Sequence, residues 1–63
     1  MITIESEVGR YMNFTDFDAA IKFSEVEYGY EGEAWKQVKN SNDFYQLEMF
    51  LNEDGIFADV EEN

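Results

Sequence analysis

The sequence predicts a single α+β domain, in which a small antiparallel sheet of three to four strands packs against two short helices. Two stretches repeat apolar residues at helical spacing, and each follows a residue type that caps helices. Other short runs alternate apolar and polar residues, which is typical of strands. The chain has 63 residues, the length of one small domain. We therefore expect residues 1–63 to form one domain, with residues 61–63 as an acidic tail.

The N-terminal part predicts two strands joined at a glycine. From Ile2 to Glu7, apolar or small residues alternate with polar ones, and the run begins with β-branched side chains. Gly9 offers a turn. Residues 10–14 predict a second, shorter strand with Met12 and Phe14 on one face.

Residues 16–24 predict the first helix. Thr15 is a suitable N-cap, and Asp16 and Asp18 place negative charge in the first turn, where the helix dipole favours it. A stripe at helical spacing is expected to face the core; it contains Phe17, Ala20, Ile21 and Ser24.

Residues 26–39 predict a hairpin. From Val26 to Tyr30 the side chains alternate as in a strand, and Glu31 with Gly32 offers a tight turn. Residues 33–39 would then return as the second arm, with Trp35 opposite the tyrosines. The same residues also favour a helix, because their residue types propagate helices well, so both alternatives stay open.

Residues 43–53 predict the second helix. Ser41 or Asn42 is the expected N-cap, and Gly55 is expected to end the helix in the left-handed conformation. Residues 56–60 then predict a short final strand. The buried stripe of this helix is expected to contain Phe44, Leu47 and Leu51, with Phe50 beside them.

Negative charge dominates the composition. Fifteen Asp and Glu residues face four Lys and Arg residues, so the net charge is −11. Six Phe, four Tyr and one Trp favour a folded domain over a disordered acidic chain, which would be poor in aromatic residues. Repulsion among like charges opposes folding, so a chain that keeps this charge is expected to use it. The same charge disfavours direct binding to nucleic acid or to anionic lipid.

Several function classes are disfavoured by what the sequence lacks. Without His or Cys, there is no imidazole base, no thiolate, no disulfide and no zinc ligand set. A domain of this size has little room for a catalytic pocket. We therefore expect neither an enzyme nor a bound cofactor. Residues 1–8 show no secretory signal, and no apolar run approaches the roughly 20 residues that span a bilayer, so we expect a cytoplasmic protein that does not bind membranes.

A calcium loop is the one metal site that the sequence suggests. Asn52 to Gly55, followed by Glu61, resembles the middle and end of an EF-hand loop. The first ligand position, however, falls on Phe50, which has no oxygen to coordinate calcium. A helix end, a glycine cap and a strand explain the same residues, so no metal is expected.

Acidic residues recur two positions apart along the chain. On an extended strand, such side chains point to the same side at about 6.6 Å, which is of the order of the phosphate spacing along one nucleic-acid strand. The simpler alternative is that strands place polar residues on their solvent face, although such faces usually mix both charges. The four pairs are Glu5/Glu7, Glu25/Glu27, Glu31/Glu33 and Asp59/Glu61.

Aromatic residues and methionine are candidates for exposed anchors, because both are enriched in protein interfaces. Tyr45 and Met49 lie off the predicted buried stripe of the second helix, so we expect them at the surface. The alternative is a small core that half-covers such side chains. The aromatic candidates for partner binding are Tyr28, Tyr30, Trp35 and Tyr45.

In size and charge the whole chain resembles the small acidic proteins by which phages and mobile elements block host defence nucleases. These include anti-restriction and anti-CRISPR proteins that imitate the phosphates of DNA. The resemblance implies a basic nucleic-acid-binding partner, such as a nuclease or a defence complex. It rests on no motif, so it assigns no residues. Two alternatives stay open: an immunity protein or antitoxin for a basic nuclease, and a small structural or assembly protein, monomeric or homodimeric, whose acidity provides only solubility.

Overall fold

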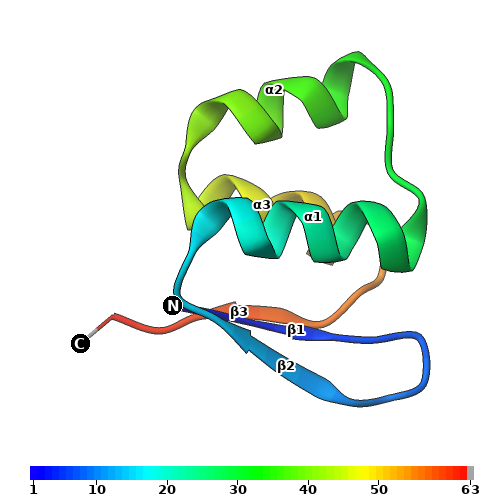
Figure 1. The fold of residues 1–63 in the computed structure, drawn as a ribbon, viewed down its shortest axis with the longest axis vertical. Coiled ribbons are helices and arrows are strands. Elements are labelled where there is room, and N and C mark those ends of the chain that lie inside the picture. Colours follow the sequence, from blue (N-terminus) through cyan, green and yellow to red (C-terminus); the bar gives the residue numbers. More distant parts are fainter. Residues whose placement is uncertain (63) are drawn as a thin grey trace.

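The computed structural model describes residues 1–62, and it confirms an α+β fold with one small antiparallel sheet. The strands lie in the order β2–β1–β3, and the helices lie on one side of the sheet (Figure 1). The other face of the sheet is uncovered. The elements are β1 (Ile2–Glu5), β2 (Tyr11–Phe14), α1 (Phe17–Tyr28), α2 (Glu33–Ser41), α3 (Phe44–Glu53) and β3 (Ala58–Val60).

The core lies between the sheet and the helices. Ile2 and Ile4 point into it from the central strand β1, and Leu47 and Leu51 meet them from α3. All four side chains are fully buried, and burial of one such side chain contributes about 1.5–3 kcal/mol. The predicted stripe of the first helix is buried as expected. In α3, Leu47 and Leu51 are buried as predicted, whereas Phe44 is half-buried.

The prediction of a strand over residues 26–30 is wrong, because α1 continues to Tyr28. The helix ends at Gly29, whose φ of 71° is left-handed and whose N–H donates to the Glu25 carbonyl. Tyr28 extends the helical stripe, since it lies four positions beyond the buried Ser24. The apparent alternation of residues 26–30 was therefore the end of a helix.

The predicted hairpin arm over residues 33–39 is also wrong, and the helical alternative is confirmed as α2. Trp35 and Val38 lie three positions apart and are the two buried residues of this helix. Trp35 is only 2% exposed, so it is a core residue rather than a surface anchor. The fold thus has three helices instead of the predicted two.

The helix caps lie one or two residues beyond the predicted ones. Asp16, not Thr15, caps α1, and its carboxylate accepts from the Ala19 N–H at 3.1 Å. Asp43, not Ser41 or Asn42, caps α3, and it accepts from the Tyr45 N–H at 2.9 Å. Both aspartates have extended backbones immediately before the helix, which is the geometry an N-cap needs.

The strands β1, β2 and β3 match the predictions with shorter bounds. β1 ends at Glu5, because residues 6–9 form the turn to β2. Gly55 follows α3 with a left-handed φ of 80°, as predicted. In the predicted tail, the Glu61 N–H donates to the Met1 carbonyl at 2.9 Å. Asn63 lies outside the described residues.

Candidate acidic interface

Six carboxylates lie around the neighbouring rings of Tyr28 and Tyr30. The C-terminal ends of α1, α3 and β1 are on this side of the molecule, on the right of Figure 1. The carboxylates come from β1 and its turn, from α1, from the α1–α2 loop and from the end of α3. We call this group the acidic end; it consists of Glu5, Glu7, Glu27, Glu31, Glu53 and Asp54.

Tyr28 and Glu27 join the end of α1 to the end of β1. The Tyr28 hydroxyl donates to the Glu5 carbonyl, and the Glu27 carboxylate accepts from the Glu7 N–H at 2.8 Å. The pKa of Tyr28 is raised, first by burial and then by the nearby charges of Glu27, Glu5 and Glu7. The Tyr28 side chain therefore links the end of β1 to these carboxylates.

Tyr30 joins the α1–α2 loop to the end of α3. Its hydroxyl donates to Asp54, and its ring packs on Trp35 and Phe50 at centroid distances of 4.9 and 5.0 Å. The pKa of Tyr30 is strongly raised, first by burial and then by the hydrogen bond to Asp54. The half-buried Tyr30 ring is therefore held in place by these contacts, beside the carboxylate of Asp54.

Two shallow cavities meet at Tyr30. One has a volume of about 220 Å³ and is lined by Tyr30, Phe50, Glu53 and Asp54. The other has a volume of about 290 Å³, and its lining combines Tyr30, Trp35 and Glu31 with the basic residues Lys36 and Lys39. The first cavity has an aromatic wall and two carboxylates without a basic residue. That combination suits a long cationic side chain, whose aliphatic stem packs on the ring while its charged head meets the carboxylate.

Helix dipoles add to the negative potential of the acidic end. Glu27 lies in the last turn of α1 and Glu53 in the last turn of α3, and neither turn contains a basic residue. A helix C-terminus carries partial negative charge, so an acidic residue there opposes folding by about 0.3–1 kcal/mol at low salt. The acids are thus held where the local field disfavours them.

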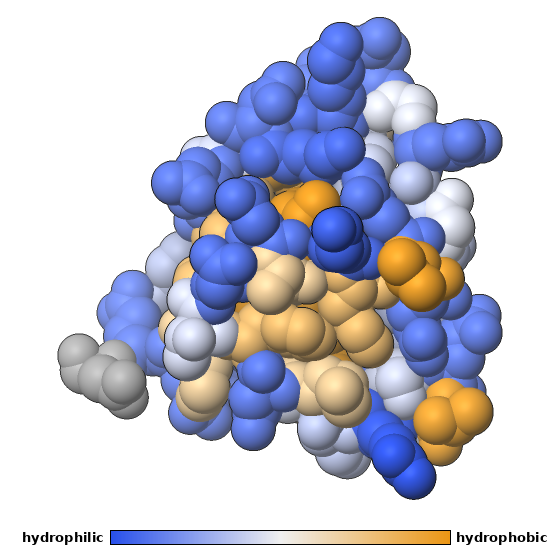
Figure 2. Space-filling model, viewed as in Figure 1, coloured by the Kyte–Doolittle hydropathy of each residue, from blue (hydrophilic) through white to orange (hydrophobic). Residues whose placement is uncertain are grey.

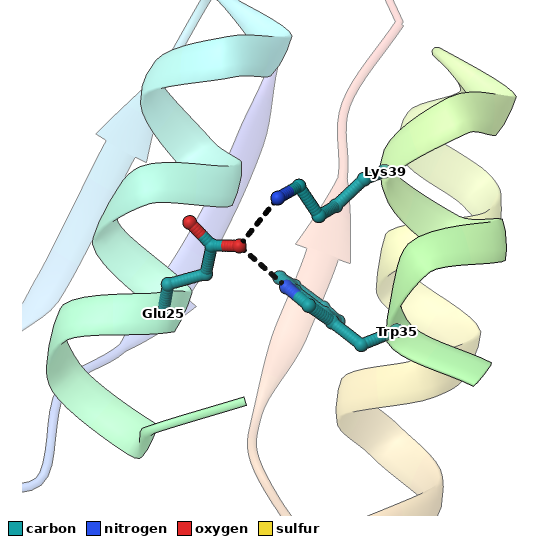
Figure 3. Close-up of polar contacts among 3 residues, drawn as sticks. All are labelled: Glu25, Trp35 and Lys39. Atoms are coloured by element: carbon teal, nitrogen blue, oxygen red, sulfur yellow. Dashed lines mark hydrogen bonds and ion pairs between the residues drawn. The ribbon is translucent and has the colours of Figure 1, made fainter. Parts of the chain in front are cut away.

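Glu25 has a different role, as Figure 3 shows. One oxygen of its carboxylate accepts from the Trp35 indole N–H and from the Lys39 ammonium group, each at 2.9 Å. These bonds lower the pKa of Glu25, with the Lys39 bond as the largest cause and the Trp35 bond next. Within residues 1–62 this is the one ion pair. Glu25 therefore holds α2 against α1.

The predicted rows of carboxylates do not form on a strand. Glu25 and Glu27 lie on a helix, where residues two apart do not face each other. Glu31 lies in a loop and Glu33 begins α2, so this pair is not extended either. The predicted phosphate-like spacing of these two pairs is therefore wrong.

The remaining predicted residues lie elsewhere. Asp59 is on β3, where it pairs across from Thr3. Tyr45 and Glu61 help to line a separate cavity of about 570 Å³, and the Tyr45 hydroxyl donates to Glu62. Tyr45 and Met49 are exposed as predicted, with exposed fractions of 46% and 55%.

Sequence reasoning missed Glu53 and Asp54. They are adjacent in the chain, so a search for acids two positions apart passes over them. A usable signal was present, because two acids without a basic neighbour follow the last turn of a predicted helix. That arrangement is unfavourable for the helix dipole.

Comparison with protein families, curated proteins and solved structures found no match to this chain. Over residues 1–62, no three metal-binding side chains lie close enough together to hold an ion. In the same region, every helix is too short or too polar to traverse a bilayer.

Proposed function

We propose that this chain is a non-enzymatic inhibitor that uses its acidic end to occupy the basic nucleic-acid-binding surface of another protein in the cytoplasm. The observation that supports this proposal is the convergence of six carboxylates from four segments, two of them at helix C-termini without a basic residue. A solvated surface has no need to collect acids at positions where they oppose folding. A surface that must attract the cationic side chains of a partner does need acids gathered in one place.

The mechanism is competition with nucleic acid. Carboxylates of the acidic end take the place of phosphates against Lys and Arg of the target, and arginine can bind a carboxylate with two parallel hydrogen bonds. The cavity between Tyr30, Glu53 and Asp54 has room for the stem of such a side chain. The negative field speeds the encounter, so association is fast at low salt and slows as salt is added. An immunity protein for a basic nuclease would work by the same chemistry.

Affinity capture tests the function. The chain is immobilised, exposed to lysate at low salt, and washed with duplex DNA to displace whatever it holds. We expect a basic nucleic-acid-binding protein to elute, and we expect the free chain to block DNA binding by that purified protein in a fluorescence anisotropy assay. If no captured protein is displaced by DNA, the inhibitor proposal is wrong.

Two matched double variants test the site. Glu31→Gln with Glu53→Gln removes two exposed charges from the acidic end, whereas Asp59→Asn with Glu61→Gln removes two exposed charges from β3 and the segment after it. We expect the first variant to weaken inhibition by about tenfold or more, mainly through faster dissociation, and the second to act mainly through slower association. Equal losses would show a diffuse field and would reject the acidic end as the site.

A further inference from the structure

Two segments of this acidic chain contain no acid and pack against each other. Residues 8–15 and 19–24 contain no Asp or Glu, and their charged residues, Arg10 and Lys22, are both basic. The two segments meet in the fold, where the rings of Phe14 and Phe23 pack 5.0 Å apart. Figure 2 shows the result as apolar surface between α1 and β2, bordered by hydrophilic residues. We call residues 10–15 with residues 19–24 the acid-free face.

β2 forms an open edge beside this face, since it pairs only with β1. The Ser6 N–H donates to the Arg10 carbonyl, so the backbone hydrogen-bonding groups of Arg10 point toward β1. Backbone direction alternates along an antiparallel strand. Met12 and Phe14 therefore also bond toward β1, and the backbone groups of Tyr11 and Asn13 point away from the sheet. These are the groups with which another strand pairs.

The edge is complementary to itself. In an antiparallel pair of two β2 strands, the outward-pointing residues must lie opposite each other. With Asn13 opposite its own copy, Met12 meets Phe14 and Arg10 meets Asp16 of the second copy. The ion pair and the apolar contact then each occur twice, as a two-fold axis requires. Asp16 is extended, and one of its carboxylate oxygens caps α1 while the other is free to accept from Arg10.

We propose that β2 pairs antiparallel with β2 of a second copy of this chain, which joins the two sheets and covers the acid-free face of each copy. Two chains of charge −11 repel each other, and this face is where the repulsion is weakest, because the charged residues of its two segments are the basic Arg10 and Lys22, and Arg10 faces the neighbouring Asp16. The strand itself has no proline and no charge to block pairing. This inference does not depend on the proposed function, which uses the other end of α1.

The first test is the molar mass by sedimentation equilibrium from micromolar to millimolar concentration. We expect twice the chain mass of 7.4 kDa at high concentration. Added salt should tighten the dimer several-fold, because it screens the repulsion of two acidic chains. Salt has the opposite effect on binding to a basic target, so the two proposals fail separately. A monomer at every concentration and salt would overturn the dimer.

Two matched pairs of variants locate the interface. Met12→Glu and Met49→Glu introduce the same charge at exposed methionines on β2 and α3. Arg10→Glu and Lys36→Glu reverse the same sign on exposed residues. We expect Met12→Glu and Arg10→Glu to weaken the dimer by about tenfold or more, and the α2 and α3 controls to leave it near the wild-type strength. Equal effects within each pair would overturn the proposal.

Amide hydrogen exchange tests the strand pairing without any substitution. We expect the amides of Tyr11 and Asn13 to become protected as the protein concentration rises, whereas the amide of Met12 is protected throughout by β1. A dimer in which Tyr11 and Asn13 still exchange fast would use another face. Protection that appears only when a target protein is added would mean that the edge holds a strand of the target. Either result rejects pairing with a second copy.

Discussion

The Glu25 carboxylate accepts from two side chains of α2, Trp35 and Lys39. Only the bond with Lys39 depends on the negative charge of Glu25. Glu25→Gln keeps an oxygen for the Trp35 indole but loses the ion pair with Lys39. We expect the variant to be less stable at neutral pH, by a small amount because both side chains are partly exposed. The pKa of Glu25 lies below its ordinary value of 4.5, so this contribution is complete above that value and is lost as the pH falls through the lowered pKa.

The measurement is the urea midpoint of wild type and Glu25→Gln at neutral pH and at successively lower pH values. The difference between the two midpoints should shrink as Glu25 of the wild type becomes protonated. Glu31→Gln is the control, because the exposed Glu31 side chain forms no hydrogen bond or ion pair among the described residues. A constant difference across the acid range would show that the charge of Glu25 does not contribute.

The hydroxyl of Tyr30 makes a second residue-level prediction. Tyr30→Phe keeps the ring contacts with Trp35 and Phe50 but loses the hydrogen bond to Asp54, which should cost about 0.5–1.5 kcal/mol. The pKa of Tyr30 is raised above 10.0. The neutral hydroxyl therefore contributes stability below that pH, and this contribution disappears as the pH rises toward the raised value.

Tyrosinate absorbance during an alkaline titration measures this effect. The wild type should show a component that ionises well above the usual range of tyrosine, and Tyr30→Phe should reduce it. Tyr28→Phe is a useful comparison, because the pKa of Tyr28 is raised for a different second cause, the nearby carboxylates. If Tyr30→Phe leaves the alkaline titration unchanged, Tyr30 is not held in the described contact.

At the scale of elements, the sequence and the structure differ in the N-cap of α1, which is Thr15 in the prediction and Asp16 in the structure. Asp16→Ala should lower the free energy of unfolding by about 0.5–2 kcal/mol, because the Ala19 N–H loses its acceptor. Thr15→Ala should change it little, since the exposed Thr15 lies one residue before the cap. Thermal or urea unfolding of the two variants decides between them. A larger loss for Thr15→Ala would restore the cap that the sequence predicted.

The elements that could be predicted from sequence are those with a local signal. The first strand, the second strand and α3 follow from alternation, helical spacing and the left-handed Gly55. The prediction for residues 26–39 failed because their local preference for strand or helix was ambiguous. Tertiary contacts decided between the two. Trp35 is a buried partner of Glu25 on another helix, which no local pattern reveals.

At the scale of the whole molecule, net charge predicts how salt affects stability. The molecule measures 27 × 27 × 19 Å. The Debye length is about 30 Å at 0.01 M salt and about 3 Å at 1 M, so charges interact across the entire molecule at low salt and only with near neighbours at high salt. We expect the free energy of unfolding to rise with sodium chloride.

Chemical denaturation over a salt series measures this dependence. The series should be repeated with Met12→Glu, so that a salt effect on self-association is separated from the effect on folding. Stability that falls with salt in both proteins would mean that favourable charge contacts outweigh repulsion. That result would weaken the case for an acidic end held under electrostatic strain.

The candidate site was only partly predictable for the same reason. Composition indicates that acids matter, but the acidic end draws Glu5, Glu27, Glu31 and Glu53 from segments that are distant in the chain. Their meeting point depends on where two helices and a strand end. No local pattern in the sequence shows that these segments end near one another. The two-residue spacing of the acids predicted strands that do not form.

The position of β1 in the sheet also has a consequence for how the chain folds. Ile2 pairs with Phe14 on one side and with Val60 on the other. The hairpin of β1 and β2 closes a short loop and can form early, whereas joining β3 to β1 closes a loop of almost the whole chain and costs more entropy. On the ribosome, where synthesis proceeds at about 5–20 residues per second, β1 must therefore wait for β3. Until then its second edge is open, and β3 completes the sheet.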